Sequence, residues 1–267
     1  MKLRAIAVNT FRSFLRNKLI LLFCALFLCV VLLFSTPLIS AKAMRNSMSA
    51  GQVEGMVASM IGAIMSLVSG FGSMLAAWAA ADTVGAEIKS GTILAVMARP
   101  VRRWEFLLGK YLGVLLLMSV YVVFLVATSY LFAWLGGQQI HSSVWPLVLY
   151  PLVRYAIYGA MAMFLAARMH PVVAFGITAI VSVVANIISP GSHELGFLPR
   201  WAETALYDVL PSTGLLSEER FLMITHASIK TIPWSEHFIA LAYGLDYALV
   251  FFLLAVWLFR RRSLTRE

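Results

Sequence analysis

Two ionisable residues interrupt long apolar runs of the sequence, and they are the first candidates for chemistry. Arg154 lies about ten residues into the run 144–166, and Asp246 lies about eight residues into the run 238–259. With a rise of about 1.5 Å per helical residue, the two depths are similar, roughly 15 and 12 Å. A lone charge inside a membrane costs at least about 2.5–3.5 kcal/mol. We therefore expect Arg154 and Asp246 to form an ion pair or to face a shared wet cavity, either as structure or along a substrate pathway.

Side chains for enzymatic catalysis follow no recognisable pattern in this sequence. The five histidines, at positions 141, 170, 193, 226 and 237, fall in expected loops or at their edges, and no HExxH metal-binding pair is present. A phosphate-binding P-loop needs GxxxxGK[ST], but Trp104 and Tyr111 stand where the first glycine and the hydroxyl residue belong around Gly109-Lys110. The sequence therefore predicts no catalytic residue, no metal site and no cofactor bound by this chain.

The composition indicates that lipid is the solvent of this chain. Of the 267 residues, 61% are hydrophobic and 12% are charged, against about 45–50% and about 25% in soluble domains. A helix needs about 20 apolar residues to cross a bilayer, with a range of about 17–25. The sequence predicts an all-α membrane protein with six transmembrane helices in one domain, 19–259. The six runs are 19–39, 56–81, 106–135, 144–166, 172–188 and 238–259.

The basic residues are unevenly distributed between the two sides of such a membrane domain. With six spans, fifteen of the 21 Lys and Arg residues fall on one side, in the first 18 residues, in the segment between the second and third spans, after the fourth span and in the basic tail 260–267. Only five fall on the other side. Positive segments stay cytoplasmic, so we expect a multi-pass protein of a bacterial cytoplasmic (inner) membrane with both termini inside. The net charge of +9 therefore reflects membrane insertion, and nucleic acid is not an expected partner.

Two segments outside the spans have amphipathic patterns. Residues 1–18 place Leu3, Ala7, Phe11 and Phe14 on one helical face, with most basic residues elsewhere, which predicts an interfacial helix. The long external connection 190–237 predicts short helices on the outer leaflet, as a gate or as a plain cap.

The cytoplasmic connection 82–105 carries a short helix of its own. A helix-start signal of Ser and Thr leads into a small apolar face, and Pro100 ends the helix. Nothing obvious in this chain covers that face, so it either docks into a partner's groove or forms an ordinary interfacial loop with basic anchors. The residues concerned are Ser90, Gly91, Thr92, Ile93, Leu94, Met97 and Pro100.

The second run carries a stripe of small residues at alternating spacings of four and three. In lipid, small residues let helices approach closely. The stripe predicts either static packing inside one bundle or a helix that slides or gates along a neighbour. Its members are Gly55, Ser59, Gly62, Ser66, Ser69, Ser73, Ala76 and Ala80.

The cytoplasmic connection resembles the signature of type-2 ATP-binding cassette (ABC) exporter permeases. In that family a Glu, a Gly-Thr pair, a Pro, an Arg and a Gly-Lys recur between spans two and three, and the family topology also matches. The resemblance implies a coupling helix at about 91–98, docked on a separate ATPase subunit that uses ATP and Mg, and a second copy of this chain or a related permease. The matching residues are Glu87, Gly91-Thr92, Pro100, Arg103, Glu105 and Gly109-Lys110.

The resemblance also implies roles for single residues. Glu87 would hold the cytoplasmic end of span two, and Arg102 or Arg103 would face the ATPase or lipid phosphate, unless they serve only as orientation signals. The predicted function is the permease subunit of an ATP-driven exporter, itself not an enzyme. The alternatives are a membrane anchor or assembly subunit that does not transport, a secondary transporter, and an intramembrane enzyme. The cargo is not indicated by any residue.

Overall fold

The computed structural model describes residues 2–18, scattered positions from 20 to 33, residues 50–90, 102–136 and 144–187, a few positions between 199 and 216, and residues 234–261. This part of the chain is all-helical, as predicted. Its helices are α1 (Lys2–Leu15), α3 (Ala50–Ser90), α5 (Arg103–Gly136), α6 (Val144–Ala166), α7 (Pro171–Ile187) and α9 (Trp234–Arg261).

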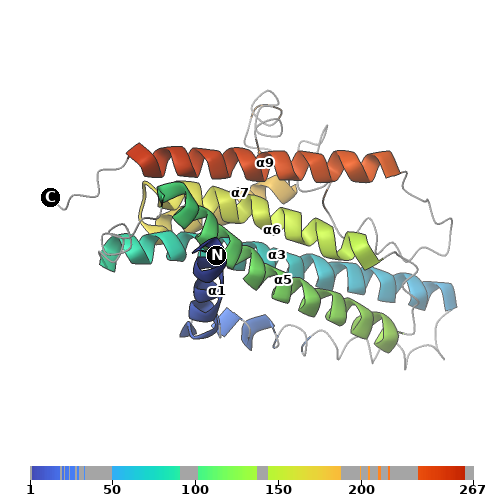
Figure 1. Ribbon diagram of the computed structural model, residues 1–267. Coiled ribbons are helices and arrows are strands. Elements are labelled where there is room, and N and C mark those ends of the chain that lie inside the picture. The colour runs from blue at the N-terminus through green and yellow to red at the C-terminus, as the bar shows by residue number, and fades with distance from the viewer. Residues whose placement is uncertain are drawn as a thin grey trace.

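Helix α6 lies at the centre of the bundle. It packs against α3, α5, α7 and α9, while α3 also packs against α5 and α7. Figure 1 shows these helices running side by side, with α1 lying across α5 near one end. Fully buried tyrosines and alanines of α6 form much of the core, including Tyr155, Tyr158 and Ala160.

Within the described residues, four helices contain stretches long and apolar enough to cross a membrane. These stretches are Ser66–Gly85, Arg103–Thr128, Val148–Ala166 and Trp234–Arg261. Helix α7 has 17 residues, and the predicted first span, 19–39, lies mostly outside the described residues. The six-span topology therefore stays a prediction.

Several predicted helix boundaries differ from the structure. Helix α3 continues to Ser90 and α5 begins at Arg103, so the connection predicted at 82–105 is shorter than expected. The alanines and valine of 79–84 remain buried and no proline interrupts them, which lets the helix run past the end of the apolar stretch. Helix α9 begins at Trp234, immediately after Pro233, four residues earlier than predicted. His237 consequently lies in the first turn of α9, not in the external connection.

Close helix crossings occur at glycines. Added Cβ atoms would collide with Tyr155 at Gly72, with Pro171 at Gly85 and with Val153 at Gly244. These contacts place α3 against α6 and α7, and α9 against α6. Since apolar side chains gain little from leaving lipid, such close backbone approach is the main source of packing energy between spans.

Several buried threonine hydroxyl groups donate to the main chain of the helix that carries them. Thr10, Thr83 and Thr178 donate to the main-chain oxygens of Ile6, Ala79 and Ala174, at 2.8, 2.6 and 2.8 Å. A hydroxyl group without an acceptor in hydrocarbon would cost several kcal/mol, on the order of the free energy of transferring an unpaired polar group out of water. The bundle therefore accommodates threonine without needing water.

Candidate functional site

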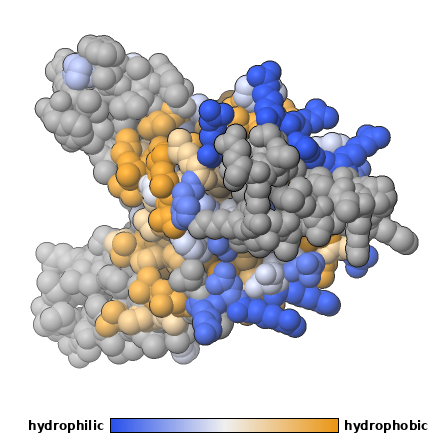
Figure 2. All heavy atoms as spheres, turned by 90° about the vertical axis from the view of Figure 1, so that its left-hand side faces the viewer, coloured by the Kyte–Doolittle hydropathy of each residue, from blue (hydrophilic) through white to orange (hydrophobic). Residues whose placement is uncertain are grey.

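Basic side chains collect at one end of the bundle, which we call the basic end. It comprises the start of α5, the α6–α7 turn and the last turn of α9, and its exposed cations are Arg102, Arg168, Arg260 and Arg261. Figure 1 places α1 and the C-terminal end of α9 at this same end. Figure 2 views the molecule from there and shows hydrophilic residues over much of the surface, with apolar residues to one side.

The start of α5 is fixed by two hydrogen bonds. The main-chain N–H of Arg102 donates to Glu105 Oε2 at 3.1 Å, as in a helix cap. Arg103 Nη1 donates to the main-chain oxygen of Arg260 at 3.1 Å. The residue that follows the predicted coupling segment is therefore bound to the end of the last helix.

Helix α1 is held against the same end. Ala7 and Phe14 are buried, Leu3 and Phe11 are half-buried, and Arg4, Arg12 and Arg16 are exposed. The crossing with α5 uses two glycines: a Cβ at Gly109 would lie 2.7 Å from Ile6 Cγ2, and one at Gly113 would lie 2.6 Å from Thr10 Cβ. After α1, Asn17 Nδ2 donates to Asp82 Oδ2 on α3 at 3.4 Å.

The two intramembrane charges lie in different surroundings. Arg154 is buried at 6% exposure, and its guanidinium lies 5.9 Å from the centroid of the Tyr155 ring. Asp246 is exposed on α9. The buried side of α9 includes Gly244 and Ala248, and a residue two positions away is rotated by roughly 200°. Asp246 thus points away from α6, and the described side chains show no ion pair between it and Arg154.

Asp246 lies near the middle of its helix. It follows Trp234 by twelve residues and precedes Trp257 by eleven, and both tryptophans are exposed. Tryptophans of this kind mark the two membrane interfaces. At about 1.5 Å per residue, Asp246 is roughly 17 Å from each, which is deeper than the sequence-based estimate because α9 begins earlier.

The long apolar helices, the small-residue crossings and the basic end together are typical of an integral membrane protein. The sequence model of the ABC-2 family of transporter proteins matches residues 4–264. The chain belongs to the ABC-2 transporter family. No curated protein matches the chain. The match covers nearly the whole chain and confirms the resemblance to type-2 ABC permeases.

Most of the predicted coupling residues of this ABC-2 permease fall outside the described residues. These are Gly91, Thr92, Ile93, Leu94, Met97 and Pro100. Glu87 lies in the last part of α3. Among the predicted coupling residues, Arg102 and Arg103 are the ones described with their side chains, and both are at the basic end.

The small-residue stripe is buried where its side chains are described, apart from its outer member. Ser69, Ser73, Ala76 and Ala80 are buried, while Ser66 is exposed. Ser69 Oγ and Tyr155 Oη share a hydrogen bond of 3.5 Å, and Ser73 Oγ donates to the oxygen of Ser69 at 3.3 Å. This part of the stripe packs against α6, which favours static packing there. The side chain of Ser59 and the surroundings of Gly62 lie outside the described part.

Tyrosines were not predicted as structural hydrogen-bond donors, although they link separate helices. Tyr121 Oη donates to the oxygen of Val68 at 2.6 Å, and Tyr111 Oη donates to that of Ala156 at 2.9 Å. Tyr150 Oη shares a 2.6 Å bond with His237 Nδ1. A sequence shows that these residues are amphipathic but not which carbonyl they reach. The described part of this permease holds no group of three or more His, Cys, Asp or Glu residues that could bind a metal.

Proposed function

We propose that this ABC-2 protein is the permease subunit of an ATP-driven exporter, with ATP and Mg used by a separate ATPase subunit. The match to the family over residues 4–264 carries the proposal. The chain would cross the membrane six times, with both termini and the basic end in the cytoplasm, because positive segments are retained there.

Residues 91–98 would form the coupling helix that docks on the ATPase. In support, α3 ends at Ser90 and α5 begins at Arg103, and Figure 1 shows the end of α3 and the start of α5 on the same side of the bundle as the end of α9. The apolar side chains of Ile93, Leu94 and Met97 would enter the groove of the partner. Glu87 would support the end of α3, and Arg102 would face acidic groups of the ATPase.

Two contacts of α5 would transmit a movement of the coupling helix to other helices of the bundle. Arg103 is bonded to Arg260 of α9, and α5 carries α1 through the crossing at Gly109 and Gly113. A displacement of the coupling helix would therefore move α1, α5 and α9 together as a rigid body. Such motions alternate access in membrane transporters.

A second copy of the chain, or a related permease, would complete the pathway. The support is Asp246, since a carboxylate exposed at mid-depth to lipid is unfavourable by about 2.5–3.5 kcal/mol or more. Covering α9 with protein or with a water-filled path at the level of Asp246 removes the penalty, and it leaves the part of the helix from Leu249 to Trp257 open to lipid. Arg154 would then act inside one helix bundle, and Asp246 would act in the space between two permeases.

Affinity purification of the tagged chain in mild detergent tests this function. We expect a stoichiometric subunit with a P-loop to copurify, and I93D/L94D/M97D to lose it. A matched triple variant in the long connection, I224D/I229D/I232D, should retain it. A preparation without any ATPase that still transports in reconstituted vesicles would favour a secondary transporter. A bound ATPase whose complex moves nothing across the membrane would favour an assembly subunit.

A further inference from the structure

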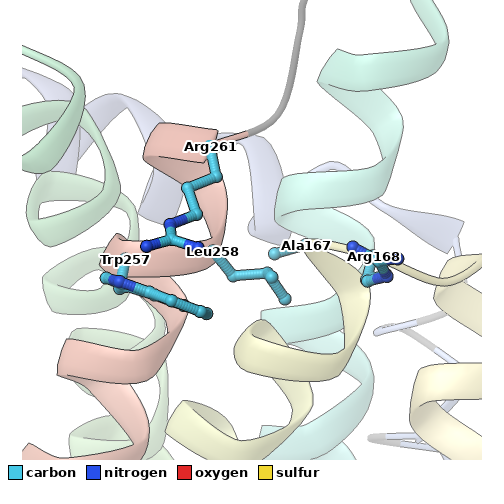
Figure 3. Close-up of a pocket in the computed structure, with 5 residues that line it drawn as sticks. All are labelled: Ala167, Arg168, Trp257, Leu258 and Arg261. Carbon is cyan, nitrogen blue, oxygen red and sulfur yellow. The ribbon is translucent and has the colours of Figure 1, made fainter.

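A pocket of about 440 Å³ opens at the basic end, between the α6–α7 turn and the last turns of α9. Figure 3 shows Leu258 pointing toward Ala167, with Trp257 and Arg261 on one side and Arg168 on the other. None of these described lining residues is acidic. The pocket therefore brings a cation of the α6–α7 turn and a cation of α9 around a partly apolar floor.

The arginines of the pocket have no anionic partner among the described residues. The guanidinium carbon of Arg261 lies 4.1 Å from the centroid of the Trp257 ring, a cation–π contact that positions the group. Arg168 lies in the turn after α6, where its main-chain nitrogen donates to the oxygen of Leu165 at 3.0 Å. Both side chains are exposed, so their N–H groups can donate to a ligand. Two guanidinium groups facing one cavity are suited to a phosphate.

An apolar stripe leads from the membrane side of α9 to this pocket. Leu249, Leu253 and Trp257 follow one another at intervals of four residues and are 58%, 55% and 50% exposed. Residues four apart lie on the same side of a helix, so the stripe is continuous. Trp257, followed by Arg260 and Arg261, is the usual arrangement at the level of lipid headgroups.

We propose that this pocket binds the anionic headgroup of a membrane phospholipid, which goes beyond the proposed transport function. The phosphate would lie between Arg168 and Arg261, and one acyl chain would follow Leu253 and Leu249. A free phosphate would use the same arginines but gain nothing from the stripe, and the stripe is why we assign a lipid. Basic pockets between the cytoplasmic ends of membrane helices bind such headgroups in general.

Native mass spectrometry of the full-length chain in detergent tests the assignment. The probes are phosphatidylglycerol, phosphatidylcholine with the same acyl chains, and inorganic phosphate. We expect phosphatidylglycerol to bind the natural chain about tenfold more tightly than phosphatidylcholine, as expected for about 1 kcal/mol from each of two arginines with some loss. R168Q/R261Q should remove this preference. R4Q/R12Q changes the net charge equally at two exposed residues of α1 outside the pocket, and should keep it.

Three results would overturn the proposal. The first is equal binding of the two lipids by the natural chain, which needs no variant to fold. The second is an equal loss in R4Q/R12Q, since the attraction would then be diffuse. The third is displacement of phosphatidylglycerol by millimolar inorganic phosphate, which would make this a site for a soluble anion. If R168Q/R261Q does not fold, L258W keeps both arginines while filling the pocket, and it should abolish the preference.

Discussion

Arg103 and Arg260, 157 residues apart in sequence, are joined by a 3.1 Å hydrogen bond from Arg103 Nη1 to the Arg260 main-chain oxygen. The last carbonyls of a helix have no partner within it, and a cation is favourable at that end of the helix dipole. The bond therefore stabilises the end of α9 and also fixes the first residue of α5. Among the described residues, this bond links α5, the helix that follows the predicted coupling segment, to α9, the last membrane helix.

Replacing Arg103 should weaken this connection without abolishing assembly. We expect R103Q to lower the ATPase activity of the reconstituted complex by about two- to fivefold, since an exposed charge-assisted hydrogen bond contributes about 1 kcal/mol or less. Copurification of the ATPase should persist. R12Q is the control, because it removes an exposed positive charge from α1. Equal losses in R12Q and R103Q would show that positive charge alone matters.

Filling the crossing between α1 and α5 should destabilise the fold. A Cβ at Gly113 would lie 2.6 Å from Thr10 Cβ, so G113A should lower the free energy of unfolding by about 1–3 kcal/mol through overpacking. The matched variant is G70A, where no atom lies within 4 Å of the added Cβ; alanine there should be neutral or stabilising by up to about 1 kcal/mol. Thermal unfolding in detergent distinguishes them. Equal midpoints for the two variants would contradict the close crossing.

The sequence predicted the helices better than the contacts between them. The apolar run 144–166 predicted both ends of α6 correctly. Polar residues on both sides of such a run limit the part of the chain that can lie in the membrane. The boundaries of α3 and α9 were less predictable, since Asp82 and Trp234 suit a helix as well as a loop. A lone charge within an apolar run is visible in the sequence, and Arg154 and Asp246 were found in that way.

The pairing of those charges could not be read from the sequence. It depends on rotation about the helix axis, and α9 turns Asp246 away from the side that packs on α6. The pocket at Arg168 and Arg261 was equally hidden, because these residues are 93 positions apart and each alone resembles an orientation signal. Gly109 and Gly113 are four residues apart in the sequence, and the structure shows that α1 packs on them.

Removing a tyrosine hydroxyl should show how much a hydrogen bond between helices contributes to stability. Tyr121 Oη donates to the oxygen of Val68 at 2.6 Å, and Tyr121 is buried. We expect Y121F to reduce stability by about 1 kcal/mol, seen as a lower thermal midpoint in detergent. Y130F changes an exposed tyrosine of the same helix and should leave the midpoint unchanged. A Y121F midpoint equal to that of Y130F would mean that the bond adds nothing.

Asp246 is the most informative position for the transport pathway. If its side of α9 faced lipid, D246L would remove a charge from hydrocarbon and raise stability by about 2 kcal/mol or more with activity unchanged. If it faces a polar path between two permeases, as we propose, D246L and D246N should lower transport-coupled ATPase activity about tenfold while the complex still assembles. The control is E236Q, which neutralises a carboxylate in the first turn of the same helix, near the interface, and should retain activity. A stabilised and fully active D246L would refute the pathway role, because transport would then need no contact of this carboxylate with an ion, water or a partner.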